Sequence, residues 1–245
     1  MDNSIAGCVL QYAGYIIEAA LALLLVRNRR RKGQGAVILY LVSLLVAELT
    51  RAYILHEFGL GSRQYFYVYW STDVLVVVSA FLLVCFFFQR ACRNEQKMWG
   101  YVRLLLAFVF VLVVGISGLI FCRNYSRLVT EFVIEFNQNL YFSCLVLNTL
   151  LYLLLQYIQS TDDQLGLLVC GMGIQFAGPA ATMALLHLTA VERFAATLNS
   201  LVIRLCTLGM LLVWAYAITR VKEYATRVTR REAPALAEVT ASSNV

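Results

Sequence analysis

The chain is poor in charge, in proline and in metal-binding side chains. Only 14% of its 245 residues are charged and 61% are hydrophobic, whereas a soluble domain carries about 25% charged residues. Two prolines and no long polar stretch leave little material for linkers between domains. Two histidines, and seven cysteines without a Cys-x-x-Cys pair, provide no spacing suited to a metal site. The composition therefore excludes an ordinary soluble domain and predicts an all-α, polytopic membrane protein without a bound metal.

Seven apolar segments, separated by short polar breaks, are each long enough to cross about 30 Å of hydrocarbon as a helix. They cover residues 5–26, 35–55, 66–90, 101–121, 128–158, 165–187 and 197–219. We expect a seven-transmembrane-helix bundle over residues 1–219, a basic amphipathic segment at 220–231 and a disordered tail at 232–245. The connections between the segments are too short to hold a further folded domain.

Lysine and arginine flank these segments unequally. Fourteen of the twenty lie toward one side, in the stretches 27–32, 90–103 and 220–231, while four lie toward the other side and two lie within segments. Positive charge marks the cytoplasmic side of a membrane protein. The distribution predicts an N-terminus outside and a C-terminus in the cytoplasm. It also places the basic side chains against lipid headgroups, which argues against nucleic-acid binding.

Most ionisable groups within the segments fall in the half that is predicted to face outside. They are Glu48, Arg51, Asp73, Glu131, Glu135 and Arg204. At 1.5 Å per residue, Asp73 lies about 10 Å below the outer interface. An unpaired charge at depth costs several kcal/mol, so each of these groups should face protein or water and not lipid.

Two ion pairs would account for both arginines without any further function. Glu48 and Arg51 stand three residues apart on one helical face, and Asp73 could pair with Arg204 from another helix. The two glutamates of the fifth segment would then have no basic partner. Either these carboxyl groups are protonated, or a cation or amine lies among them, or water reaches them from outside.

A ligand pocket is the other interpretation of the same residues. Tyr69 and Trp70 share a helical face with Asp73 and could hold an organic cation by cation–π contact, although an interfacial aromatic belt also explains such residues. The residues that we predict to line an outward-facing pocket are Glu48, Arg51, Tyr69, Trp70, Asp73, Glu135, Gln138 and Arg204. Protons or a small cationic ligand would suit such a lining.

The sixth segment is rich in small residues. Gly171, Gly173 and Gly178 permit close packing of helices. Pro179 can bend the helix and open the centre of the bundle, where Gln175 lies. The pattern is compatible with both roles.

Enzyme motifs are weak in this chain. The stretch 115–118 has the form GISG and matches the GxSG serine motif of rhomboid proteases, but no basic or amide groups are placed to form an oxyanion site around it. The three lysines all lie outside the segments, which excludes the retinal Schiff base of microbial rhodopsins. The sequence therefore predicts no catalysis and no cofactor.

The run YFYVYW at 65–70, the acidic Asp73 and a long apolar stretch ending in FQRACR resemble uncharacterised seven-helix membrane proteins of acidobacterial type. Similar modules form the membrane portion of some bacterial sensor kinases. The resemblance implies a sensor or partner-binding subunit, and we expect it in the bacterial inner (cytoplasmic) membrane with a separate protein partner. A small proton- or cation-coupled transporter is the alternative, although the first and last three segments show no repeat. A purely structural subunit of a larger membrane complex is the second alternative.

Overall fold

The computed structural model describes residues 5–27, 34–59, 62–94, 96–123, 128–158, 162–188 and 202–219, and the regular elements in these ranges are all helical. They are α1 (Ile5–Arg27), α2 (Gly35–Phe58), α3 (Arg63–Ala91), the short 3₁₀ helix η1 (Cys92–Asn94), α4 (Gln96–Arg123), α5 (Leu128–Tyr157), α6 (Asp163–Leu188) and a C-terminal helix (Val202–Thr219). The all-α prediction is confirmed. The segments predicted at 220–231 and 232–245 lie outside the described residues.

Five helical stretches in the described ranges are long and apolar enough to cross a membrane. They are Gly35–Phe58, Arg63–Ala91, Lys97–Ile116, Phe136–Tyr157 and Val202–Thr219. On α4, Leu104, Phe108 and Val111 form an exposed stripe that suits contact with lipid and would be unfavourable in water. The chain is therefore a helical membrane protein, while the count of seven spans and their direction stay predictions.

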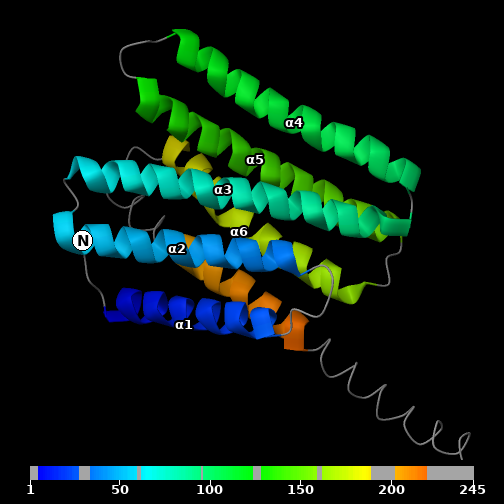
Figure 1. The fold of residues 1–245 in the computed structure, drawn as a ribbon, viewed down its shortest axis with the longest axis horizontal. Coiled ribbons are helices and arrows are strands. Elements are labelled where there is room, and N and C mark those ends of the chain that lie inside the picture. Colours follow the sequence, from blue (N-terminus) through cyan, green and yellow to red (C-terminus); the bar gives the residue numbers. More distant parts are fainter. Residues whose placement is uncertain are drawn as a thin grey trace, which may run out of the picture.

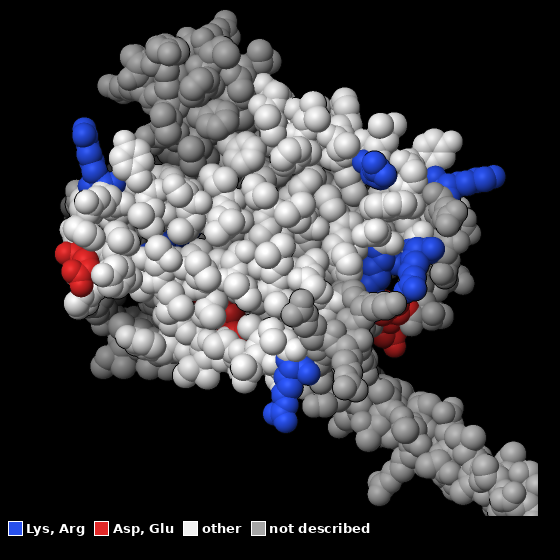
Figure 2. All heavy atoms as spheres, in the orientation of Figure 1, with Lys and Arg blue, Asp and Glu red and all other residues white. Residues whose placement is uncertain are grey.

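The helices run roughly parallel or antiparallel to one another, with α4 at one margin and α1 at the other (Figure 1). Lys and Arg gather mainly toward one end of the bundle, and the broad middle of the visible face carries little charge (Figure 2). That end, here called the basic end, includes Arg27 in the last turn of α1 and Arg90 in the last turn of α3. It is the end that the sequence predicts to face the cytoplasm.

Helix α3 lies at the centre of the packing, because it contacts α2, α4, α5 and α6. Its buried residues Val77, Ala80, Val84 and Phe87 recur every three or four positions, the spacing of one helical face. Helices α2 and α3 are joined by a short connection and pack against each other along their length. Because the two helices are antiparallel, polar groups near the end of α2 lie opposite those near the start of α3.

Close packing between α6 and the C-terminal helix confirms the role predicted for the glycines. A Cβ at Gly171 would lie 2.6 Å from Nε1 of Trp214, and one at Gly178 would lie 2.6 Å from Sγ of Cys206. The indole N–H of Trp214 donates to the carbonyl oxygen of Leu168 at 3.0 Å. The side chain of Pro179 lies outside the described part of the structure.

An ion pair joins α3 to α6 at the basic end. Arg90 donates from Nε to Oδ2 of Asp162 at 2.9 Å and from Nη2 to Oδ1 at 3.1 Å. Asp162 also accepts from the backbone N–H of Leu165 at 3.1 Å, which caps the first turn of α6. One carboxylate thus fixes the start of α6 against the end of α3.

Candidate functional site

Arg51 of α2 is bound to one turn of α3. Its Nη2 lies 3.1 Å from Oδ1 of Asp73 and donates to the carbonyl oxygen of Tyr69 at 3.2 Å, while its Nε donates to Oγ1 of Thr72 at 2.7 Å. The guanidinium carbon also lies 4.3 Å from the centre of the Tyr69 ring, a cation–π distance. Thr72 and Asp73 follow Tyr69 by three and four positions, so all three lie toward the face that α2 covers.

Asp73 is held from a third helix as well. The side-chain N–H of Asn137 on α5 donates to its Oδ2 at 2.8 Å. The two carboxylate oxygens are thus bound by α2 and α5. The pairing with Arg204 that the sequence suggested is not the one formed among the described residues, because α2 is the antiparallel neighbour of α3 and brings Arg51 opposite Asp73.

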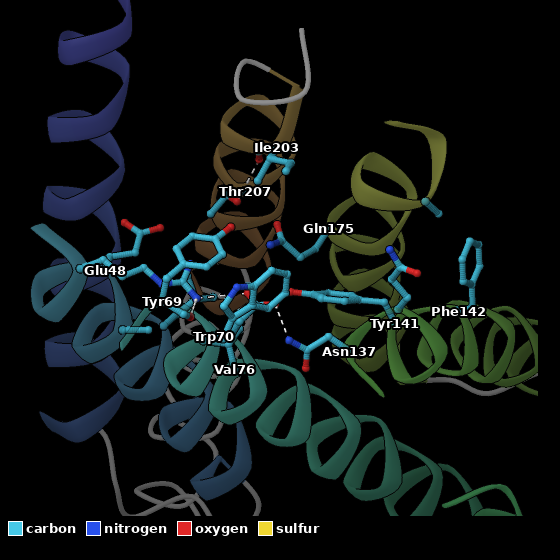
Figure 3. A pocket seen from close by; sticks show the side chains of 16 residues that line it. Glu48, Tyr69, Trp70, Val76, Asn137, Tyr141, Phe142, Gln175, Ile203 and Thr207 are labelled. Atoms are coloured by element: carbon cyan, nitrogen blue, oxygen red, sulfur yellow. Dashed lines mark hydrogen bonds and ion pairs between the residues drawn. The ribbon is translucent and has the colours of Figure 1, made fainter. Parts of the chain in front are cut away.

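A cavity of about 200 Å³ lies beside this ion pair, between α2, α3, α5, α6 and the C-terminal helix (Figure 3). It is lined by Leu44, Ala47, Glu48, Arg51, Tyr69, Trp70, Asp73, Val76, Asn137, Gln138, Tyr141, Phe142, Gln175, Ala180, Ile203 and Thr207. Asp73 lies in the first half of α3, so the cavity occupies the half of the bundle that is farther from the basic end.

The structure brings six of the eight predicted pocket residues to this cavity. They are Glu48, Arg51, Tyr69, Trp70, Asp73 and Gln138. Arg204 is not among the lining residues, but it interacts electrostatically with Glu48, and its neighbours Ile203 and Thr207 line the wall. Glu131 and Glu135 belong to α5, and their side chains lie outside the part of the structure that is described.

The prediction of the pocket missed ten of the sixteen lining residues, among them Asn137, Tyr141 and Gln175. Asn137 and Tyr141 belong to the same face of α5, four positions apart, and the polar run at 137–139 was the available signal for them. Gln175 was expected at the bundle centre but was not assigned to the pocket. It points from α6 toward Tyr69 and Trp70 (Figure 3).

Several buried acceptors near the cavity have no hydrogen-bond partner among the described residues. They include Oδ1 of Asn137 and Oε1 of Gln175, whose residues are 3% and 7% exposed. The orientation of the Asn137 amide is fixed by its bond to Asp73, so its free atom is the oxygen. Glu18 of α1 is also buried and interacts electrostatically with Glu48, and its Oε1 has no hydrogen-bond partner in the described part of the chain.

This arrangement can bind and orient a small polar molecule. Two carboxylates, a guanidinium group, three amides and aromatic rings converge on the cavity. The described residues contain no group of three or more His, Cys, Asp or Glu side chains that could hold a metal ion. Comparison of the chain with known protein families, with curated proteins and with solved structures found no match. The resemblance to acidobacterial seven-helix proteins and to sensor modules therefore stays a prediction.

Proposed function

We propose that this protein is a non-enzymatic integral membrane sensor that binds a small ligand in the cavity and transmits the binding to a protein partner. The observation that carries the proposal is a cavity walled by five helices. A fixed ion pair, aromatic rings and amide oxygens that have no hydrogen-bond partner among the described residues meet in it. Ligand sites have this character, being mostly apolar with a few convergent polar groups. We place the protein in the bacterial inner membrane as a seven-helix bundle, with the cavity in its outer half.

The ion pair alone does not explain the cavity. Asp73 and Arg51 satisfy each other and also bind Thr72, Tyr69 and Asn137. A buried pair that serves packing alone would be expected to lie in a filled core, because protein interiors contain few voids larger than a water molecule. The extra space beside the pair therefore supports a binding role.

Transmission would follow from the position of the cavity between helices. A ligand that contacts Glu48 on α2 and Gln175 on α6 favours one spacing of these helices over another, which shifts the population of two bundle arrangements. The C-terminal helix, with Ile203 and Thr207 in the cavity wall, continues in sequence into the basic segment 220–231. We propose that this segment faces the cytoplasm and contacts the partner.

A cavity-filling variant tests the proposal. Purified protein in zwitterionic nanodiscs is screened by thermal unfolding against small amines, carboxylates, alcohols and sugars. Ala47 is buried and lines the cavity, whereas Ala52 of the same helix is exposed. We expect at least one class to raise the unfolding temperature of the wild type and of Ala52→Phe, but not of Ala47→Phe. If no class stabilises the protein in a cavity-dependent way, the proposed function is wrong.

The second candidate is a small proton- or cation-coupled transporter, and one observation favours it. Glu18 lies buried on α1 and interacts electrostatically with Glu48 of the cavity wall, so two carboxyl groups lie in succession across the bundle. Proton relays in membranes use such series. Ligand-driven proton uptake into vesicles that is lost in the Glu18→Gln variant would support the transporter. If the wild type shows no such uptake, the transporter is excluded and the sensor stays the proposed function.

A further inference from the structure

Two acceptor groups in the polar lining of the cavity receive no hydrogen bond from the described residues. The Nε and Nη2 groups of Arg51 are engaged with α3, and the amide N–H of Asn137 is given to Asp73. What faces the cavity in addition is the carboxylate of Glu48, to which no described residue donates a hydrogen bond, and the unpartnered Oε1 of Gln175. A ligand that donates hydrogen bonds would satisfy these groups, whereas one that only accepts would not.

The described charges around the cavity leave no unmatched guanidinium group for an anion. Asp73 pairs with Arg51, and Glu48 interacts electrostatically with both Arg51 and Arg204. Glu18 adds a third carboxyl group, which interacts with Glu48. This set therefore disfavours an anionic ligand.

The aromatic part of the wall suits a cation attached to an apolar group. Arg51 already covers the ring of Tyr69. The indole of Trp70 stands edge-on to that ring, with 5.5 Å between their centres. Tyr141 extends from α5 toward the same cavity (Figure 3). Trp is the strongest cation–π partner among side chains, so Trp70 is the ring to which a second cation would bind.

The size of the cavity limits the ligand. A dry cavity of about 150 Å³ accepts benzene, and sites for drug-sized molecules range upward from about 300 Å³. A cavity of about 200 Å³ therefore suits a molecule with about one ring and a short polar arm.

We infer that the cavity binds a small primary ammonium compound, whose N–H groups donate to Glu48 and to Oε1 of Gln175 while its apolar part lies against Trp70. The inference rests on the proposed function, since it names the ligand class of the same cavity. The role of Arg51 and Asp73 is then to hold α2, α3 and α5 around the site, and not to contact the ammonium group.

Three probes of equal size and different charge test the inference. Benzylammonium, benzyl alcohol and benzoate are titrated at neutral pH into the full-length protein in zwitterionic nanodiscs, and the dissociation constant is measured from the shift in thermal unfolding. Benzylammonium has three N–H donors and a charge opposite to that of Glu48, whereas benzyl alcohol has one O–H donor and no charge. We therefore expect benzylammonium to bind at least about tenfold more tightly than benzyl alcohol. Benzoate should bind most weakly of the three.

Two variants assign the preference to the cavity. Glu48→Gln should reduce the preference for benzylammonium over benzyl alcohol to less than about threefold, whereas Glu57→Gln, at an exposed position near the end of the same helix, should keep it. Gln175→Leu provides a second test on α6 if Glu48→Gln does not fold. Equal or tighter binding of benzyl alcohol or benzoate overturns the inference. The same holds if none of the three probes binds.

The two proposals fail in different ways. If another class of small molecule stabilises the wild type but not Ala47→Phe, the cavity is a ligand site and only the ammonium class is wrong. If the broad screen finds no cavity-dependent ligand, both proposals are wrong.

Discussion

The pairing of Arg51 with Asp73 can be tested by a double-mutant cycle that predicts a rescue. Arg51→Met removes the guanidinium while keeping a long helix-forming side chain. Among the described residues, Asp73 then retains only its bond from Asn137 and has no counter-ion, at 19% side-chain exposure. Removal of one partner from a fully buried pair costs about 3–5 kcal/mol. Because this pair is partly exposed, we expect a loss of about 2–3 kcal/mol in the free energy of unfolding.

The second side of the cycle is expected to cost less. Asp73→Asn keeps an oxygen for Arg51, and Asn137 can turn its amide to present the oxygen that now has no partner. This variant replaces a hydrogen bond between two charged groups by one to a neutral amide, so the free energy of unfolding should fall by about 1 kcal/mol. In the double variant no uncompensated carboxylate remains, so adding Asp73→Asn to Arg51→Met should restore about 1 kcal/mol or more.

Reversible unfolding in mixed micelles, titrated with SDS and followed by tryptophan fluorescence, measures the four free energies. Arg63→Met is the control, because Arg63 is an exposed arginine at the start of α3 and should change stability by no more than about 0.5 kcal/mol. If Asp73→Asn costs the same in both backgrounds, the two side chains do not interact and the geometry derived for the site is wrong.

Two further predictions concern the packing around α6. Gly171→Ala should lower the free energy of unfolding by about 1–3 kcal/mol, because its new methyl group overlaps the buried indole of Trp214. A methyl group at Gly166 of the same helix meets nothing within 4 Å, so Gly166→Ala should stabilise the protein by up to about 1 kcal/mol. SDS titration of both variants checks this contrast, and equal effects would contradict it. Asp162→Ala removes a helix cap and an ion pair with α3 and should cost about 1–2 kcal/mol. The neighbouring Asp163→Ala should cost only about 0.5 kcal/mol through the helix dipole, and the same titration would refute the cap if the two losses were equal.

The apolar runs predicted the helices well and their ends less well. Helix α4 begins at Gln96 and not at 101, because its first turn carries polar residues that a hydropathy reading assigns to the connection. Helix α3 begins at Arg63 and not at 66, since Ser62 accepts from the backbone N–H of Tyr65 at 3.1 Å and caps it. Hydrophobicity measures the part of a helix in hydrocarbon, whereas caps decide where the helix itself begins.

The residues of the site were easier to predict than their partners. Each helix shows its own polar face through the 3.6-residue period, which is how Glu48, Tyr69 and Asp73 could be selected. The pairing depends on how neighbouring helices are rotated, and a change of one residue turns a face by about 100°. One signal was available in the sequence. The short connection makes α2 and α3 antiparallel neighbours, which places Arg51 and Asp73 at a similar depth along the bundle axis. The sequence holds no comparable information on which helix lies beside Arg204.

The unpartnered amide oxygens could not be predicted from the sequence, and they link stability to binding. A buried acceptor without a partner destabilises the folded state by about 1–3 kcal/mol. Two of the acceptors that lack a partner among the described residues, on Asn137 and Gln175, belong to the cavity wall. A ligand that donates to Gln175 would recover part of that free energy, and this recovery contributes to affinity without any new apolar contact. Because Gln175 and Glu48 come from different helices, the same hydrogen bonds that hold the ligand would also hold α6 at one distance from α2.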